Sequence, residues 1–77
     1  MKVTLESTTK IVELTLDGQM LPARVWEGTT EHGIRCHAYI TRIAVAKDLD
    51  ASQFERELQE HRSPTPAIEA IPLRLIL

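Results

Sequence analysis

The dipeptide Asp17-Gly18 stands between two stretches in which apolar and polar residues alternate. In "IVELTL", residues 11–16, the apolar side chains from Val12 onward occupy every second position, which is typical of a half-buried strand. Asp-Gly favours a type I′ turn, because both central residues of that turn need positive φ and glycine adopts such values without steric cost. The sequence therefore predicts a β-hairpin that turns at residues 17–18.

Further strands are predicted on both sides of this hairpin. Residues 2–8, "KVTLEST", alternate in the same way, and the hydroxyl-rich "STTK" is expected to turn the chain into residues 11–16. Residues 20–28, "MLPARVWEG", predict a third strand in which Pro22 lies at an edge or a bulge, because proline has no N–H donor. Residues 34–46 predict a fourth strand, but the apolar alternation changes parity within it. We therefore expect a bulge or a bend at Thr41-Arg42.

Residues 47–62, "KDLDASQFERELQEHR", predict one helix. Asp50 suits the N-cap position, with Gln53 returning the bond and with Leu49 and Phe54 forming a hydrophobic staple. Spacings of three and four residues predict an inward stripe of Ala51, Phe54, Leu58 and His61.

The remaining residues complete a small α+β domain. Pro64 and Pro66 end the helix, and residues 72–77 predict a final strand that starts at Pro72. The order is then β-β-β-β-α-β in one domain over residues 1–77, with a mainly antiparallel sheet and one helix packed on one face. A chain of 77 residues buries only about 60–65% of its unfolded surface, and one cysteine cannot form an internal disulfide. A partner subunit would add stability, and the terminal strand offers an edge for a homodimer.

Residues 31–37, "EHGIRCH", bring together side chains that can bind metal or act as nucleophiles. Neighbouring residues of a strand point to opposite faces, so Cys36 and His37 cannot share one ion without a bulge. The spacing also lacks the paired ligands of zinc sites. A reactive thiol needs an exposed, electropositive position, whereas the alternation places Cys36 inside a strand. We expect no enzyme activity, no cofactor and no metal, with a small metal-binding protein as an alternative whose candidate ligands are His32, Cys36, His37 and His61.

A mixed basic and aromatic surface is predicted on the outward face of the fourth strand, where Trp26 of the third strand would lie beside it. Tyrosine, tryptophan and arginine are enriched among the residues that dominate protein–protein binding. The predicted interaction surface consists of Trp26, Arg35, His37, Tyr39 and Arg42. Such residues also bind single-stranded nucleic acid, although a net charge of −2 gives no general attraction to phosphate. Trp26 and Tyr39 can equally serve only to cover the second face of the sheet.

The helix surface is a second candidate for docking, because acidic side chains outnumber basic ones along residues 48–62. Such a face can dock on a basic groove of a partner. It is also common for an acidic helix face to serve only solvation. Both interpretations stay open from the sequence.

Three stretches, "ARVWEGTTEHGIRCHAYITRIAV", "SQFERELQEH" and "IPLRLIL", together resemble a group of small uncharacterised proteins of phages, prophages and their bacterial hosts. The resemblance spans most of the chain and includes no catalytic motif. It implies a small accessory protein that binds a protein of the host or the phage, for example to modulate a host complex. The first ten residues lack the apolar run of a signal peptide, and no stretch approaches the roughly 20 apolar residues of a membrane span. We therefore expect a cytoplasmic bacterial protein without a membrane partner.

Overall fold

The structure is a computed structural model in which residues 1–48 and 50–76 are described. Four strands form one sheet in the order β3-β2-β1-β4, with bounds β1 Val3–Leu16, β2 Gln19–Thr30, β3 Arg35–Ile40 and β4 Arg74–Ile76. Two short helices, α1 (Ala51–Glu57) and α2 (Pro66–Glu69), lie between β3 and β4 in the chain. The first three strands pair antiparallel, whereas β4 joins β1 in parallel. The α+β class is confirmed, and the sheet is mixed.

The hairpin between β1 and β2 turns where the sequence predicts. Leu16 pairs with Gln19, and the two residues between them have φ values of +50° at Asp17 and +78° at Gly18. Positive φ at both positions is the requirement of a type I′ turn. The predicted turn at residues 17–18 is therefore confirmed.

The predicted turn at residues 7–10 is wrong, because β1 runs through it as one strand with a bulge. Ser7 pairs with Trp26 and Ile11 pairs with Arg24, so three residues of β1 lie opposite Val25 alone. A later part of the chain fills the interruption, since the Arg62 N–H donates to the Ser7 carbonyl at 3.1 Å. The local pattern of "STTK" suits a turn, but contacts from residue 62 hold it extended.

Thr8 lies at the centre of this bulge with no exposed surface. Its hydroxyl donates to the Val25 carbonyl oxygen at 2.6 Å and accepts from the Lys10 N–H at 3.2 Å. Buried hydrogen bonds of this kind compensate for the removal of both backbone groups from water. The hydroxyl therefore stabilises the bulge from inside.

We expect Thr8→Val to lower the free energy of unfolding by about 1–3 kcal/mol, because the buried Val25 carbonyl and the partly buried Lys10 N–H lose their partner while the side-chain shape is kept. Urea unfolding measures this effect. Thr9→Val is the matched control, since Thr9 is exposed and should change stability by less than about 0.5 kcal/mol. Equal effects of the two substitutions would show that the Thr8 hydroxyl is not important.

One face of the sheet, the core face, holds the buried apolar residues Val12, Leu14, Ala23 and Val25 together with Ile68 of α2. Tyr39, Ile71 and Leu75 pack against this cluster. Tyr39 was expected on an outward face, and the structure corrects this: it projects from β3 toward the core. The register explains the placement, because Tyr39 pairs with the buried Val25.

The fourth predicted strand is shorter than expected. β3 ends at Ile40, and a bend follows at Thr41, so the chain leaves the sheet where the apolar alternation changes parity. The predicted bend is confirmed, and the predicted continuation of the strand to residue 46 is wrong. The consequence is a long irregular connection from β3 to α1.

The helix start at Asp50 is confirmed, because its side chain accepts from the Ser52 N–H at 2.9 Å. Gln53 does not complete a capping box, since its side-chain oxygen accepts from Arg56 at 2.5 Å. The predicted staple includes Leu49, which lies outside the described residues. α1 ends at Glu57, so His61 follows the helix and is exposed.

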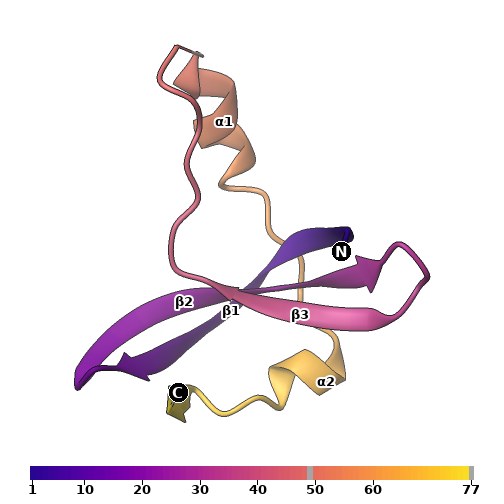
Figure 1. Ribbon diagram of the computed structural model, residues 1–77, viewed down its shortest axis with the longest axis vertical. Coiled ribbons are helices and arrows are strands. Elements are labelled where there is room, and N and C mark those ends of the chain that lie inside the picture. The colour runs from indigo at the N-terminus through magenta and orange to yellow at the C-terminus, as the bar shows by residue number, and fades with distance from the viewer. Residues whose placement is uncertain (49, 77) are drawn as a thin grey trace.

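The two helices lie on opposite sides of the sheet (Figure 1). α2 lies against the core face, whereas α1 stands away from the other side and has no buried residue. The expected packing of the long helix on the sheet is therefore not seen, and α2 supplies the buried helical residue instead. With α1 only seven residues long, the described part of the chain contains no helix of the length and apolar character that a bilayer crossing requires.

Pro22 lies at an edge, as expected, whereas Pro72 lies outside the strand that it was expected to begin. β3 pairs only with residues 24–29 of β2, so Pro22 lies where β2 has a neighbour on one side alone. Pro72 precedes β4, which covers Arg74–Ile76. Each proline thus lies at a sheet edge or before the start of a strand, where a missing N–H donor is tolerated.

Candidate functional site

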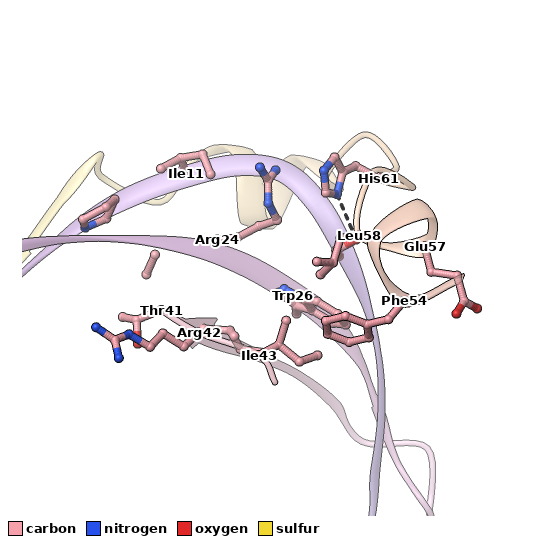
Figure 2. A pocket seen from close by; sticks show the side chains of 14 residues that line it. Ile11, Arg24, Trp26, Thr41, Arg42, Ile43, Phe54, Glu57, Leu58 and His61 are labelled. Carbon is pink, nitrogen blue, oxygen red and sulfur yellow. Dashed lines mark hydrogen bonds between the residues drawn. The ribbon is translucent and has the colours of Figure 1, made fainter. Parts of the chain in front are cut away.

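A groove of about 410 Å³ opens between α1 and the second face of the sheet, the groove face (Figure 2). Its volume lies in the range of about 300–1,000 Å³ that is usual for binding pockets. Most of its lining is apolar and comes from the sheet, the connection after β3 and α1: Ile11, Trp26, Ile40, Ile43, Phe54 and Leu58.

Strand register brings the sheet residues of the groove together. Arg24 pairs with Ile11 on one side and with Ile40 on the other, so these side chains share one face. Trp26 follows two residues later on the same face. From the opposite wall, Phe54 of α1 points toward Trp26 and Ile43 (Figure 2). The groove therefore has aromatic side chains on both walls.

Charged side chains lie at both ends of the groove and between them. Arg42 lies at one end and Glu57 at the other, with Arg24 between them (Figure 2). The Arg24 guanidinium donates to the Thr8 carbonyl oxygen at 2.7 Å, which holds its charge beside the bulge. Within residues 1–48 and 50–76, ion pairs involve only Arg62 and His32 as the basic partners. Arg42 and Glu57 therefore present their charges to whatever enters the groove.

The structure divides the predicted interaction surface between the two faces of the sheet. Trp26 and Arg42 line the groove. Trp26 pairs with Ala38, so Arg35, His37 and Tyr39, at the odd positions of β3, project to the core face. His37 and Tyr39 contact each other there, with 3.1 Å between the imidazole Nε2 and the phenolic oxygen. The predicted set is therefore not one continuous surface.

Ser7 and His61 form a close pair of a hydroxyl and an imidazole at the rim of the groove, with 3.0 Å between Oγ and Nδ1 (Figure 2). The Ser7 hydroxyl also donates to the Glu60 carbonyl oxygen at 2.7 Å. A hydroxyl donates one hydrogen bond, so Ser7 then accepts from the imidazole N–H. This direction is opposite to the one in which a histidine acts as a base toward serine. The pair ties the chain after α1 to β1.

Glu27 is the most constrained ionisable residue that the sequence reasoning missed. Its side chain is buried on the core face, where it accepts from the Arg62 guanidinium at 2.5 Å and from the Thr65 N–H at 3.0 Å and hydroxyl at 2.9 Å. Burial raises the pKa of Glu27, but the hydrogen bonds from Thr65 and Arg62 outweigh it and hold the pKa below its ordinary value. The signal in the sequence was its spacing from Ala23 and Val25, because residues at every second position of a strand point to the same face. Its role is to anchor the chain that returns from α1.

The candidate metal ligands are spread over the molecule. Cys36 is half-buried opposite Gly28, His37 lies opposite Glu27, and His32 is exposed in the turn before β3. Cys36 and His37 thus point to opposite faces, as their adjacency predicts. Over the residues that the structure describes, no three histidine, cysteine, aspartate or glutamate side chains are grouped so that they could hold an ion.

Comparison of the chain with protein-family models, with curated proteins and with solved structures finds no match. The resemblance to phage-encoded proteins therefore stays a prediction. The function has to be inferred from the groove itself, from its apolar walls and from the charges at its ends.

Proposed function

We propose that this protein is a non-enzymatic interaction module that binds a partner protein in the groove between Trp26 and α1. The observation that carries the proposal is an excess of exposed surface. The chain exposes 6090 Å², whereas a folded monomer of its mass exposes about 4,700 Å². Its radius of gyration is 13.8 Å, against about 11.5 Å for a compact chain of this length.

The groove face and α1 contribute exposed apolar side chains to this surface. Ile11 and Ile43 are 40% and 46% exposed, and Trp26 and Phe54 are only half-buried. Contiguous exposed apolar surface marks interaction sites, and buried aromatic side chains are the usual anchors of binding. A partner that fills the groove would bury the apolar side chains of α1 and of the groove face, which together would form a second hydrophobic core.

The groove favours an apolar, helical segment of a partner with acidic flanking residues. Two arginines, Arg24 and Arg42, lie along the groove, whereas Glu57 is confined to one end. Complementary charges of this kind orient a bound segment and raise its association rate. Insertion of an amphipathic helix into an apolar groove is a recurring mode of recognition. An accessory protein of a bacterial or phage system that acts on a protein complex would need such a surface.

Site-specific photo-crosslinking in a bacterial lysate tests the proposal. With benzophenone at position 41, an exposed position that lines the groove, we expect an adduct with a protein other than this chain. The same group at position 37, exposed on the core face, should give at least about 10-fold less adduct.

Ile43→Ser is the variant that links the adduct to the groove. Ile43 is 46% exposed, so its replacement should leave the fold intact, which circular dichroism checks. Loss of an apolar anchor of about 1.5 kcal/mol should reduce the adduct at position 41 about 10-fold. Equal adducts at both positions, or no effect of Ile43→Ser, would contradict the proposal. Adducts that disappear after nuclease treatment would indicate nucleic acid as the ligand instead.

A further inference from the structure

We infer that, in the isolated protein, the groove is occupied by a second copy of this chain in a face-to-face homodimer. The inference rests on the proposed function, because it needs the groove to be a protein-binding surface. It names the partner, and it places the dimer contact on the groove face rather than at the edge of β4. A foreign partner and the second copy would then compete for one surface.

The exposed surface area of the chain is large enough for a dimer contact. The chain exposes about 1,400 Å² more than a folded monomer of its mass should. A standard interface buries about 800 Å² of each partner, and the interfaces of obligate homodimers bury more. The excess is therefore of the size that one homodimer contact removes.

The charges at the two ends of the groove fit a symmetric contact. Arg42 and Glu57 lie at opposite ends of one groove (Figure 2). When two identical grooves face each other about a two-fold axis that runs across them, Arg42 of each copy meets Glu57 of the other. An axis along the groove would place like charges together. The charges at the two ends of the groove are thus complementary in one orientation, which favours a symmetric contact.

Part of the apolar surface on the groove face is not covered by α1. Figure 1 shows that α1 rises over one part of the sheet and leaves the hairpin end of β1 and β2 uncovered on that side. Met20, near this end, is 40% exposed, and its pairing with Thr15 places it on the groove face. In the dimer, α1 of each copy lies over this uncovered part of the other sheet.

The edge of β4 is a weaker candidate for the same role. β4 contains three residues, Arg74–Ile76, and one of its two edges already pairs with β1. An edge of three residues offers few backbone hydrogen bonds to another strand, and very short edge strands are a common protection against such pairing. The charges at the ends of the groove favour the groove face.

Charge reversal tests the inference on the full chain. Light scattering and native mass spectrometry should give wild-type protein about twice the mass of one 8.7 kDa chain at low ionic strength. Arg42→Glu and Glu57→Arg should each weaken the dimer about 10-fold, because each variant makes two like-charge contacts with its own copy. Both residues are exposed, so folding should be unaffected.

Mixing the two variants is the decisive step. A dimer with one chain of each variant has two attractive contacts, so mixing should restore association to near the wild-type level. Arg35→Glu is the matched control: it makes the same change on the other face and should leave the dimer unchanged. A dimer that both variants form as well as wild type, or no recovery on mixing, would overturn the inference.

The two proposals fail in different ways. A monomer at every concentration, together with a foreign adduct at position 41, overturns the homodimer and leaves the interaction module intact. A dimer that each charge reversal weakens and that mixing restores, without any foreign adduct, supports the homodimer and overturns binding of a different protein in the groove.

Discussion

Gly28→Ala is expected to lower the melting temperature by about 15 °C, or to prevent folding. A Cβ atom at position 28 would lie 1.8 Å from the Thr4 carbonyl oxygen and 3.0 Å from the Leu5 Cα. These are backbone atoms of β1, so β1 has to move away from β2, and the pairing of Leu5 with Gly28 is lost. A cost of at least about 3 kcal/mol, the upper end for overpacking, corresponds to this shift in a domain of fewer than 100 residues.

Thermal unfolding followed by circular dichroism measures the effect, and hydrogen exchange locates it. The amides of residues 3–7 should lose protection first. Gly18→Ala is the control: no atom lies within 4 Å of its added Cβ, so only the positive φ opposes it, at about 1 kcal/mol. A Gly28→Ala protein that melts like Gly18→Ala would contradict the close approach of β1.

Glu27→Ala is expected to cost about 2–4 kcal/mol at pH 7. The substitution leaves the Arg62 guanidinium and two donors of Thr65 without their carboxylate, and it frees the chain that returns from α1. In a domain whose total stability is about 4–12 kcal/mol, this is a large part. Urea unfolding gives the difference, and Glu13→Ala, an exposed glutamate of β1, should change stability little.

The pH dependence of stability identifies the charge of Glu27 as the cause. Because its pKa is lowered in the folded protein, Glu27 stabilises the fold above its ordinary pKa of 4.5 and loses this contribution as the pH falls through the folded value. The melting temperature of wild type should therefore fall on acidification below about pH 5. Glu27→Gln should show a smaller fall, with the remainder partly from Asp50, whose pKa is lowered by the Ser52 N–H. Parallel curves for wild type and Glu27→Gln would contradict this role.

Local features of the sequence predicted local features of the fold. Asp17-Gly18 specifies the turn between β1 and β2, and Asp50 specifies the start of α1. The change of parity in the apolar alternation near Thr41 specifies the end of β3. Each depends on residues within a few positions. The continuity of β1 through residues 7–10 could not be predicted in this way, because Arg62, more than 50 positions later, supplies the hydrogen bonds that hold it.

The candidate site was predicted in part, and register explains the difference. Trp26 and Arg42 were identified, but their expected neighbour Tyr39 lies on the other face, since Trp26 pairs with Ala38. A strand shifted by one residue presents every side chain to the opposite face, and the length of the turn between β2 and β3 sets this shift. Phe54 was expected against the sheet as core and instead forms the far wall of the groove. Whether α1 closes on the sheet depends on the long connection after Thr41, which the apolar alternation predicted to be part of a strand.

Residues 7–10 of β1 are held by Arg62, which is synthesised more than 50 positions later, so the parts of the fold form in sequence during synthesis. Strands β1, β2 and β3 pair through neighbouring turns, so most of this sheet can form as soon as residue 40 has left the ribosome, before Arg62 holds residues 7–10 of β1. Helix α2, which covers the core face, and strand β4, which pairs with β1, follow about 2–7 s later at ordinary rates of translation. During that interval Val12, Leu14 and Val25 face water on a three-stranded sheet. We expect the nascent chain to be a client of chaperones that hold apolar strands, and its yield to depend on how fast residues 41–76 are translated.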